Sequence, residues 1–368
     1  MTKIKEFLKS EAVLIISFIL AAASAFVVKP NAGYVDYIDF RTLALLFCLM
    51  AVMAGLRRLG VFSLLAKKLL SLSGSARSLC LILSLLCFFS SMIITNDVAL
   101  ITFVPFSIVA LKLSGKEKLL IPLVTIETVA ANLGSMLTPI GNPQNLYLFS
   151  VFEMSTADFF KTILPYALLS LILVAAFALF IKNERIEFSS ESENSEININ
   201  LCAVYIILFA AALLTVFRVI PFEITFALSL IILLIFDRKA VASVDYSLLL
   251  TFTFLFIFIG NLKNVAPVSE FLKSIVNGNE VLAGVACSQI FSNVPAAILL
   301  SGFTSNASEL LIGVNLGGLG TLIASMASLI SFKYMIKEKV SAGRYLLIFT
   351  AVNIIFLALN LGLRAVIK

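Results

Sequence analysis

The sequence predicts an all-α polytopic membrane protein, and three observations lead to that prediction. The 368 residues are 61% hydrophobic and only 13% charged, with a mean hydropathy of +1.08. The apolar residues form continuous runs, whereas the strands of a membrane β-barrel alternate. Several runs approach the roughly 20 residues that a helix needs to cross about 30 Å of hydrocarbon. We therefore expect a multi-pass protein of the cell (inner) membrane, surrounded by the lipid bilayer.

Composition also excludes several classes of function. The net charge of +6 requires no nucleic-acid partner, because the basic residues lie in short loops, where they set the orientation of a membrane protein. The chain contains no histidine, which excludes histidine-based metal sites and proton relays. Neither an HExxH nor a GxSxG motif occurs, so we expect no enzyme and no cofactor. The five cysteines lie inside apolar segments and are expected to be free.

The first half of the chain contains helices, a hairpin and a broken helix. The charged residues that flank these runs place the N-terminus in the cytoplasm. In chain order, the expected elements are helices at 12–28 and 40–56, a membrane-surface helix at 61–74, a hairpin at 78–111, a broken helix at 119–152 and a helix at 163–181.

The second half repeats this order after a polar, acidic loop at 183–198. The closing helix places the C-terminus outside. The expected elements are helices at 201–217, 223–236 and 246–262, a membrane-surface helix at 264–277, a hairpin at 280–304, a broken helix at 309–332 and a helix at 345–363.

Each hairpin is expected to turn at a polar tripeptide, Thr95-Asn96-Asp97 or Ser292-Asn293-Val294. Neither arm of the first hairpin is comfortably long enough to span the membrane, so its tip should lie near the membrane centre. Asp97 can cap the second arm, because its short side chain carries hydrogen-bond acceptors. A helix N-terminus carries partial positive charge and free N–H donors. Two such termini that meet would form an anion site without any buried Lys or Arg.

The run 119–152 is expected to contain an unwound middle. Gly134, Pro139, Gly141 and Pro143 cannot all lie within one regular helix. Unwound backbone at membrane depth is tolerated only where it is buried in protein or lines a cavity. The unwound segment should therefore offer backbone carbonyls and amide side chains to a ligand.

The two halves show an internal repeat. Residues 90–101 align with 287–298, and residues 132–142 align with 315–325. Four crossings in each half and one linking helix give nine, so the halves should be inverted, a pattern typical of secondary transporters. The expected domains are a first repeat at 1–182, a cytoplasmic linker at 183–198, a linking helix at 199–221 and a second repeat at 222–368.

Three strings, TNDVALITFVP, ANLGSMLTPIGNPQNLYL and SNVPAAILL, resemble the ion transporter superfamily. This group includes arsenite permeases, citrate–metal permeases, sodium–proton antiporters of the NhaD type and divalent-anion/sodium symporters. The string TPIGNPQN is most similar to the arsenite/citrate permease-like branch. The resemblance covers nearly the whole chain and implies an elevator mechanism and a homodimer. The divalent-anion symporters carry Ser-Asn-Thr at both tips, and Val294 here removes one hydroxyl.

The polar residues of the tips and broken helices are the candidate ligands, although the same atoms could serve only helix capping or packing. Asp97 and Glu127 need a cation, a proton or a strong structural partner, because a carboxylate at the membrane centre costs roughly 2.5–3.5 kcal/mol. The candidates for substrate binding are Thr95, Asn96, Thr138, Asn142, Ser292, Asn293, Thr321 and Ser325. The candidates for cation or proton coupling are Asp97, Glu127, Asn132, Gly141, Asn145, Asn315 and Gly317, with Na⁺ expected at Asn96, Asp97, Asn132 and Gly141.

These features predict a secondary transporter of a small inorganic or carboxylate anion, coupled to Na⁺ or H⁺. The alternatives are a Na⁺/H⁺ antiporter without an organic substrate and an arsenite-type efflux permease. A channel is a remote alternative, because the Asn142-Pro143-Gln144 string occurs once, whereas aquaporin-like folds have a paired Asn-Pro-Ala.

Overall fold

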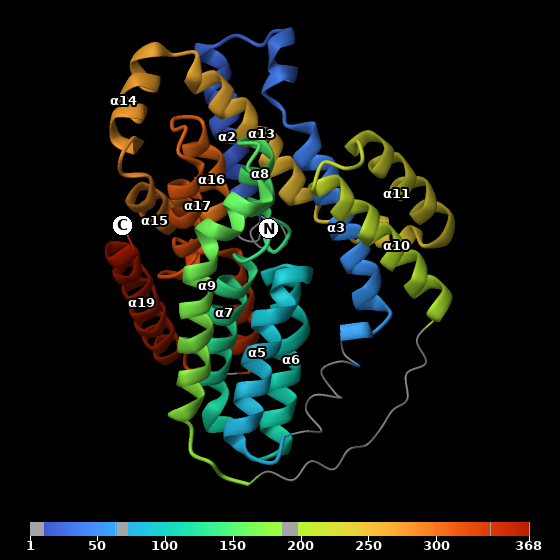
Figure 1. Ribbon diagram of the computed structural model, residues 1–368, viewed down its shortest axis with the longest axis vertical. Helices are drawn as coiled ribbons and strands as arrows, with labels where there is room; N and C mark the ends of the chain where they lie inside the picture. The colour runs from blue at the N-terminus through green and yellow to red at the C-terminus, as the bar shows by residue number, and fades with distance from the viewer. Residues whose placement is uncertain (1–10, 63, 65–72, 186–197, 339, 368) are drawn as a thin grey trace, which may run out of the picture.

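The computed structural model describes residues 11–62, 64, 73–185, 198–338 and 340–367. This part of the chain is almost entirely helical (Figure 1). Seven of its helices are long and apolar enough to cross a membrane. The predicted class, a polytopic helical membrane protein, is thus confirmed. The predicted surface helix at 61–74 and the linker at 183–198 lie largely outside the described residues.

The helices of the first half occur in the predicted order, but the last of them begins at Thr156 and not at residue 163. They are α2 Ala12–Val27, η1 Ala32–Tyr37, α3 Phe40–Arg58, α5 Ala76–Ile94, α6 Asn96–Leu113, η2 Glu117–Leu119, α7 Leu120–Ser135, α8 Pro143–Val151 and α9 Thr156–Leu179.

The helices of the second half follow a similar order. They are α10 Ile199–Val216, α11 Phe222–Phe236, α12 Arg238–Ala242, α13 Tyr246–Lys263, α14 Ala266–Val276, α15 Glu280–Phe291, α16 Asn293–Ser301, α17 Ala307–Leu316, η3 Leu322–Ala324, α18 Met326–Lys337 and α19 Ala342–Ile367.

The arms of the first hairpin are longer than predicted. Helix α5 has 19 residues and α6 has 18, and both are long and apolar enough to span a membrane. The prediction of short arms was wrong because it assumed that the helices stop before the charged residues on either side. Instead, α5 begins beside Arg77, with a capping box formed by Ser75 and Ser78, and α6 continues past Lys112. The arms of the second hairpin, α15 and α16, have only 12 and 9 residues.

The helices form two groups that lie on different sides of the molecule. Helices α5, α6, α7 and α9 pack side by side in one group, and α3 packs with α10 and α11 in the other (Figure 1). The second group is tightly joined at one end of α3. There, Asp237 accepts a hydrogen bond from Tyr205 Oη at 2.5 Å and pairs with Arg58 at 3.0 Å. Gly55 permits this contact, since a Cβ there would lie 1.9 Å from the Tyr205 ring.

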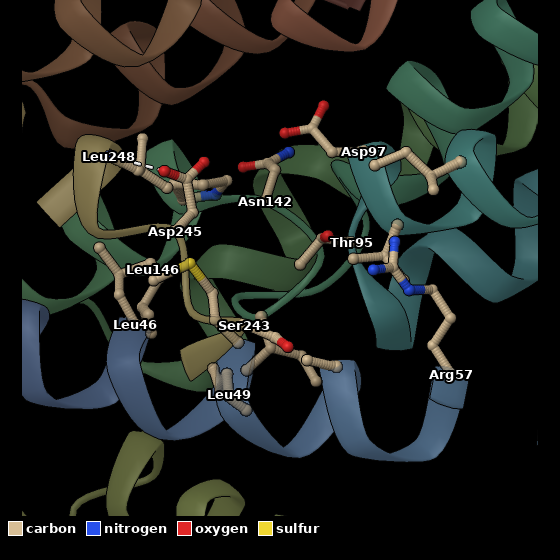
Figure 2. Close-up of a pocket in the computed structure, with 16 residues that line it drawn as sticks. Leu46, Leu49, Arg57, Thr95, Asp97, Asn142, Leu146, Ser243, Asp245 and Leu248 are labelled. Atoms are coloured by element: carbon tan, nitrogen blue, oxygen red, sulfur yellow. Dashed lines mark hydrogen bonds between the residues drawn. The ribbon is translucent and has the colours of Figure 1, made fainter. Parts of the chain in front are cut away.

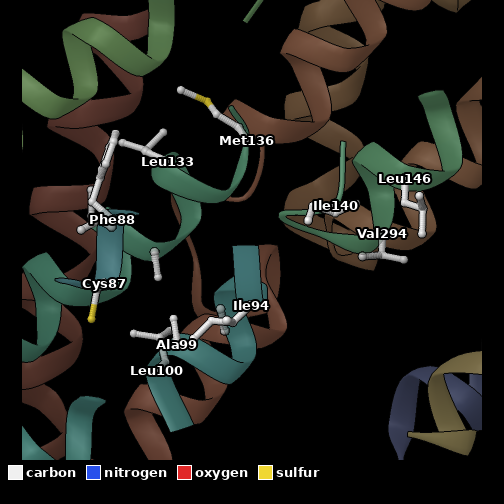
Figure 3. Packing of buried hydrophobic residues seen from close by; sticks show 14 of the residues in the cluster. Cys87, Phe88, Ile94, Ala99, Leu100, Leu133, Met136, Ile140, Leu146 and Val294 are labelled. Carbon is white, nitrogen blue, oxygen red and sulfur yellow. The ribbon is translucent and has the colours of Figure 1, made fainter. Parts of the chain in front are cut away.

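Both broken helices are interrupted by a segment that is not α-helical, and the second of these segments contains the short 3-10 helix η3. The first break separates α7 from α8, and the second separates α17 from α18. The first break folds back on itself at Gly141, where a Cβ would lie 2.0 Å from the carbonyl oxygen of Ser135. Apolar side chains surround these segments, and Figure 3 shows Val294 of α16 beside Leu146 of α8.

The predicted surface segment 264–277 contains the helix α14. Its apolar side chains Phe271 and Ile275 are 63% and 48% exposed. A helix that lies along a membrane surface would direct such side chains into the lipid.

Candidate functional site

The two hairpins turn at single residues that share one backbone conformation. Thr95 lies between α5 and α6 with φ 74° and ψ 154°. Ser292 lies between α15 and α16 with φ 73° and ψ 154°. This region is almost reserved for glycine, and a residue with a side chain costs about 1–3 kcal/mol there. Each strained residue is followed directly by the first residue of a helix, Asn96 or Asn293.

Asp97 does not cap α6, so that prediction was wrong. The helix begins at Asn96, which places Asp97 inside the first turn, and no side-chain capping bond forms at this end. The first two N–H groups are satisfied in other ways. The N–H of Asn96 donates to the carbonyl of Gly141 at 3.3 Å, and the N–H of Asp97 donates to Asn96 Oδ1 at 3.0 Å.

Asn132 joins the first tip to the second broken helix. Its Oδ1 accepts hydrogen bonds from Asn96 Nδ2 and from Ser325 Oγ, both at 3.0 Å. Its Nδ2 donates to the carbonyl of Gly318 at 3.5 Å. Residues far apart in the sequence therefore meet at one amide group. Of the four residues expected to hold Na⁺, Asn96, Asn132 and Gly141 use these polar groups in contacts within the protein.

A second group of buried amides links the two broken helices directly. Asn142 Nδ2 donates to Asn315 Oδ1 at 3.1 Å, and Asn315 Nδ2 donates to Asn145 Oδ1 at 2.6 Å. Asn145 Nδ2 also donates to the carbonyls of Met136 and Thr138, both at 3.0 Å, and so holds the first break closed. The three asparagines are at most 2% exposed. We call these three linked asparagines the amide wall, and of them Asn142 lines the cavity described below.

The second tip is attached through Gln289, a residue that the sequence analysis missed. Gln289 Nε2 donates to the carbonyls of Gly317 and Leu319, both at 2.9 Å, and its Oε1 accepts from the N–H of Thr321 at 2.9 Å. The signal in the sequence is a polar glutamine within an apolar segment. This signal is weak, because Gln289 aligns with the apolar Met92 in the other half. At the first tip, the Thr138 hydroxyl donates to the Met92 carbonyl.

A cavity of about 200 Å³ lies between α3, the first tip and the start of α13. Figure 2 shows its polar side chains, and the guanidinium group of Arg57 points toward Thr95. Three predicted site residues, Thr95, Asp97 and Asn142, line this cavity. Arg57, Ser243 and Asp245 line it as well, and none of them was predicted. Basic residues at a helix end, such as the two arginines that end α3, indicate only membrane orientation from the sequence.

The two tips meet at a much smaller gap of about 10 Å³. Asn96 and Asp97 line it from the first tip, and Asn293 and Val294 line it from the second. Ser325 and Gln144 complete its polar lining. Asp97 Oδ1 and Gln144 Oε1 are buried and have no hydrogen-bond partner among the described residues. Such atoms are rare in folded proteins, so each calls for a ligand, a proton or a water.

Glu127 lies apart from these two spaces. It is fully buried in α7, it accepts a hydrogen bond from the Ser107 hydroxyl, and it lines neither the cavity nor the gap. Its Oε2 has no hydrogen-bond partner in the described part of the chain. The structure therefore does not place Glu127 beside Asp97 in a common cavity.

The model of the citrate transporter family matches residues 6–328. An uncharacterized transporter of Methanocaldococcus jannaschii is 35% identical over 319 residues, 84% of this chain and 85% of that protein. An inner membrane protein of Escherichia coli is 31% identical over 307 residues, 80% of each chain. A silicon efflux transporter of Oryza sativa subsp. japonica is 32% identical over 140 residues, 38% of this chain and 28% of that protein.

These matches confirm the resemblance to the ion transporter superfamily. The family model covers most of the chain, and the two longest matches extend over most of both proteins. The relatives bear names of transporters or of a membrane protein, in agreement with the apolar helices of this fold. This chain is a multi-pass membrane transporter that belongs to the citrate transporter family.

Proposed function

We propose that this protein is a cation-coupled secondary transporter of a small anion or oxyanion. The observation that carries the proposal is the buried, unpartnered Oδ1 of Asp97 at the first hairpin tip. A carboxylate in a membrane protein needs a cation, a proton or a strong partner. Asp97 lines both the gap between the tips and the larger cavity. A cation bound there would lie next to the space that a substrate could enter.

The coupling ion in this proposal is Na⁺ or H⁺ at Asp97. Gln144 Oε1 lines the same gap and adds a neutral oxygen, a suitable ligand for a hard cation. Asn96 and Asn132 act indirectly, because the hydrogen bond between them fixes the tip against the broken helix. Transport would follow an elevator mechanism, in which the hairpins and broken helices move against α3, α10 and α11.

The substrate in this proposal is an anion, in line with the family name, citrate transporter. One observation favours a second candidate, a neutral hydroxylated acid exported against protons. Both Asp97 and Asp245 line the cavity, and two carboxylates disfavour an anion unless a cation or proton neutralises one of them. The similarity to a silicon efflux transporter points in the same direction, although it covers only 38% of this chain. Exchange of Na⁺ for H⁺ without an anion is a third mode.

Thermal unfolding of the purified protein tests these candidates. The scan compares sodium with choline at two pH values, with and without citrate, inorganic phosphate and arsenite. A ligand at a hundredfold excess over its Kd stabilises the folded state by about 2.7 kcal/mol. Anion stabilisation that appears only with sodium or at low pH supports the proposal. Stabilisation by arsenite alone favours the neutral acid.

A second assay addresses antiport. Proteoliposomes loaded with sodium are acidified outside in the absence of any added anion. Under the proposal, no proton exchange occurs. Sodium-dependent proton movement under these conditions would contradict the proposal and support a Na⁺/H⁺ antiporter.

A further inference from the structure

We propose that Arg57 is the residue that recognises the negative charge of the substrate. This inference rests on the proposed function and adds a specificity-determining residue on α3, outside the hairpins and broken helices. Arg57 lies in the last turn of α3 and lines the cavity together with Thr95, Asp97 and Asn142. Its guanidinium group points toward Thr95 at the first tip (Figure 2).

The partners of the two neighbouring arginines differ. Arg58 pairs with Asp237 at 3.0 Å and so helps to hold α3 against the neighbouring helices. The side chain of Arg57 makes no hydrogen bond or ion pair to any other described residue, although the residue is half-buried. A guanidinium group carries five donors in a rigid planar arrangement and binds carboxylate or phosphate through two parallel hydrogen bonds. Arg57 thus has its full donor capacity available at the cavity.

The first tip itself has few donors left for an anion. The N–H groups of Asn96 and Asp97 are already bonded to Gly141 and to the Asn96 side chain. Asn142 Nδ2 is bonded to Ser135 and Asn315. The N–H donors at the start of α6, which were expected to bind an anion, are therefore partly occupied by bonds within the protein. Arg57 adds a charged donor from another helix, and it is the cationic side chain among the described residues that line this cavity.

The charges around the cavity also suggest why an anion would need a coupling ion. Arg57 faces two carboxylates, Asp97 and Asp245, so the lining carries one excess negative charge when both are ionised. A cation or proton at Asp97 would leave Arg57 balanced against Asp245. An anion then meets no net repulsion, and Arg57 can turn to it. We infer that the cation binds first and that Arg57 contacts the anion afterwards.

The size of the cavity restricts the class of anion. Pockets for drug-sized ligands have volumes of about 300–1,000 Å³. This cavity measures about 200 Å³, and mostly apolar side chains complete its lining. It suits a compact anion with up to three carboxylate groups, such as citrate, or a tetrahedral oxyanion, that presents two oxygens to one guanidinium group.

The test compares Arg57→Gln and Arg57→Lys with the neighbouring variant Arg58→Gln. Citrate and inorganic phosphate are titrated into full-length protein in sodium, and the thermal shift gives the apparent Kd. Sodium is also titrated alone. We expect Arg57→Gln to weaken anion binding by about 10- to 100-fold, the loss of a charge-assisted hydrogen bond. Its response to sodium should be unchanged, and Arg58→Gln should bind the anion as the wild type does.

Arg57→Lys retains the charge but loses the paired donors, and we expect an intermediate affinity. This variant carries the test if Arg57→Gln does not fold. An anion affinity equal to that of the wild type in either folded variant would overturn the role of Arg57. If neither anion stabilises the wild-type protein under any condition, the proposed function fails, and this inference fails with it.

Discussion

The two hairpin tips share a backbone conformation but differ in chemistry. Thr95 and Ser292 have nearly identical torsion angles, and an asparagine begins the next helix in both cases. The following residue is Asp97 at the first tip and Val294 at the second. Asp97 lines both the cavity and the gap, whereas Val294 lines only the gap. The backbone turn therefore does not require a charged residue at the position after the asparagine. One half of the chain can carry an ion site that the other half lacks.

The attachments of the two tips differ as well. At the first tip, the side chains of Asn96 and Thr138 connect the hairpin to the broken helices. At the second tip, Gln289 makes the corresponding connection with three hydrogen bonds. In both halves, hydrogen bonds therefore hold the hairpin tip against the broken helix, but different residues make them.

Replacement of Asp97 tests the difference between the tips most directly. We expect Asp97→Asn to weaken cation binding by about 10- to 150-fold, because a hydrogen bond or ion contact to a charged group contributes about 1.5–3 kcal/mol. Transport into proteoliposomes should fall by at least the same factor. Sodium- or pH-dependent thermal shifts measure binding separately from transport.

Asp245→Asn is the matched control for that experiment. Asp245 lines the same cavity, and its Oδ1 caps α13 by accepting the N–H of Leu248 at 2.9 Å. Asparagine caps a helix about as well as aspartate, so this variant removes a charge without loss of the cap. Cation binding should survive in Asp245→Asn. Equal loss in both variants would show that the total charge of the cavity matters and that Asp97 is not a specific ligand.

The amide wall between the broken helices should contribute to stability. We expect Asn315→Ala to lower the free energy of unfolding by about 1–3 kcal/mol, because the buried Oδ1 of Asn145 is left without its donor. Chemical unfolding in detergent measures the change. Asn353→Ala is the control, since Asn353 is equally buried but its side chain donates only within its own helix, to Phe349 at 2.8 Å. Similar losses in both variants would contradict a special role for the wall.

The tips and breaks could be predicted from the sequence, but their partners could not. Polar residues inside apolar runs have few permitted arrangements in a membrane, so Asn96, Asn293 and the Gly/Pro-rich break were located correctly. Asn142 and Asn315 are separated by 173 positions, and spacing alone does not show which amides will meet. The ends of α5 and α6 were misplaced because helices continue through flanking charged residues.

Arg57 and Gln289 were missed for different reasons. Arg57 stands beside Arg58 at a helix end, where basic residues are expected to mark the cytoplasmic side. Only the fold distinguishes the arginine that pairs with Asp237 from the one that faces the cavity. The repeat alignment concealed Gln289 because Met92 occupies the equivalent position. Identical residues in the two halves do not reveal such positions, because Gln289 attaches its tip through side-chain hydrogen bonds and Met92 through its backbone carbonyl.

Gln289→Met makes the second tip resemble the first at this position. We expect a loss of about 1 kcal/mol in the free energy of unfolding, because the N–H of Thr321 and two carbonyls lose a partner. Gln289 is half-buried, so water can replace some of these bonds, and the effect should be smaller than for Asn315→Ala. Differential scanning fluorimetry measures both. An unchanged midpoint would indicate that the second tip is held by packing alone.

We expect the smallest change in stability from a substitution at Glu127. Its counterpart in the second half is Leu310, which is also fully buried. Glu127→Gln keeps an acceptor for the Ser107 hydroxyl, so we expect less than about 1 kcal/mol change in stability. If Glu127 carries a proton, transport should lose its dependence on pH while anion binding persists. A pH profile identical to that of the wild type would limit Glu127 to a structural role.

The backbone of the tips has a consequence for how these positions tolerate change. Thr95 and Ser292 occupy a conformation that glycine would adopt freely, and Thr95 is also β-branched. A chain optimised only for folding would carry glycine at both. The hydroxyl groups are retained at a thermodynamic cost, which is the pattern expected where stability is given up for activity. Glycine variants at Thr95 and Ser292 would thus separate folding stability from ligand binding. We expect them to be more stable than the wild type and to bind their ligands more weakly.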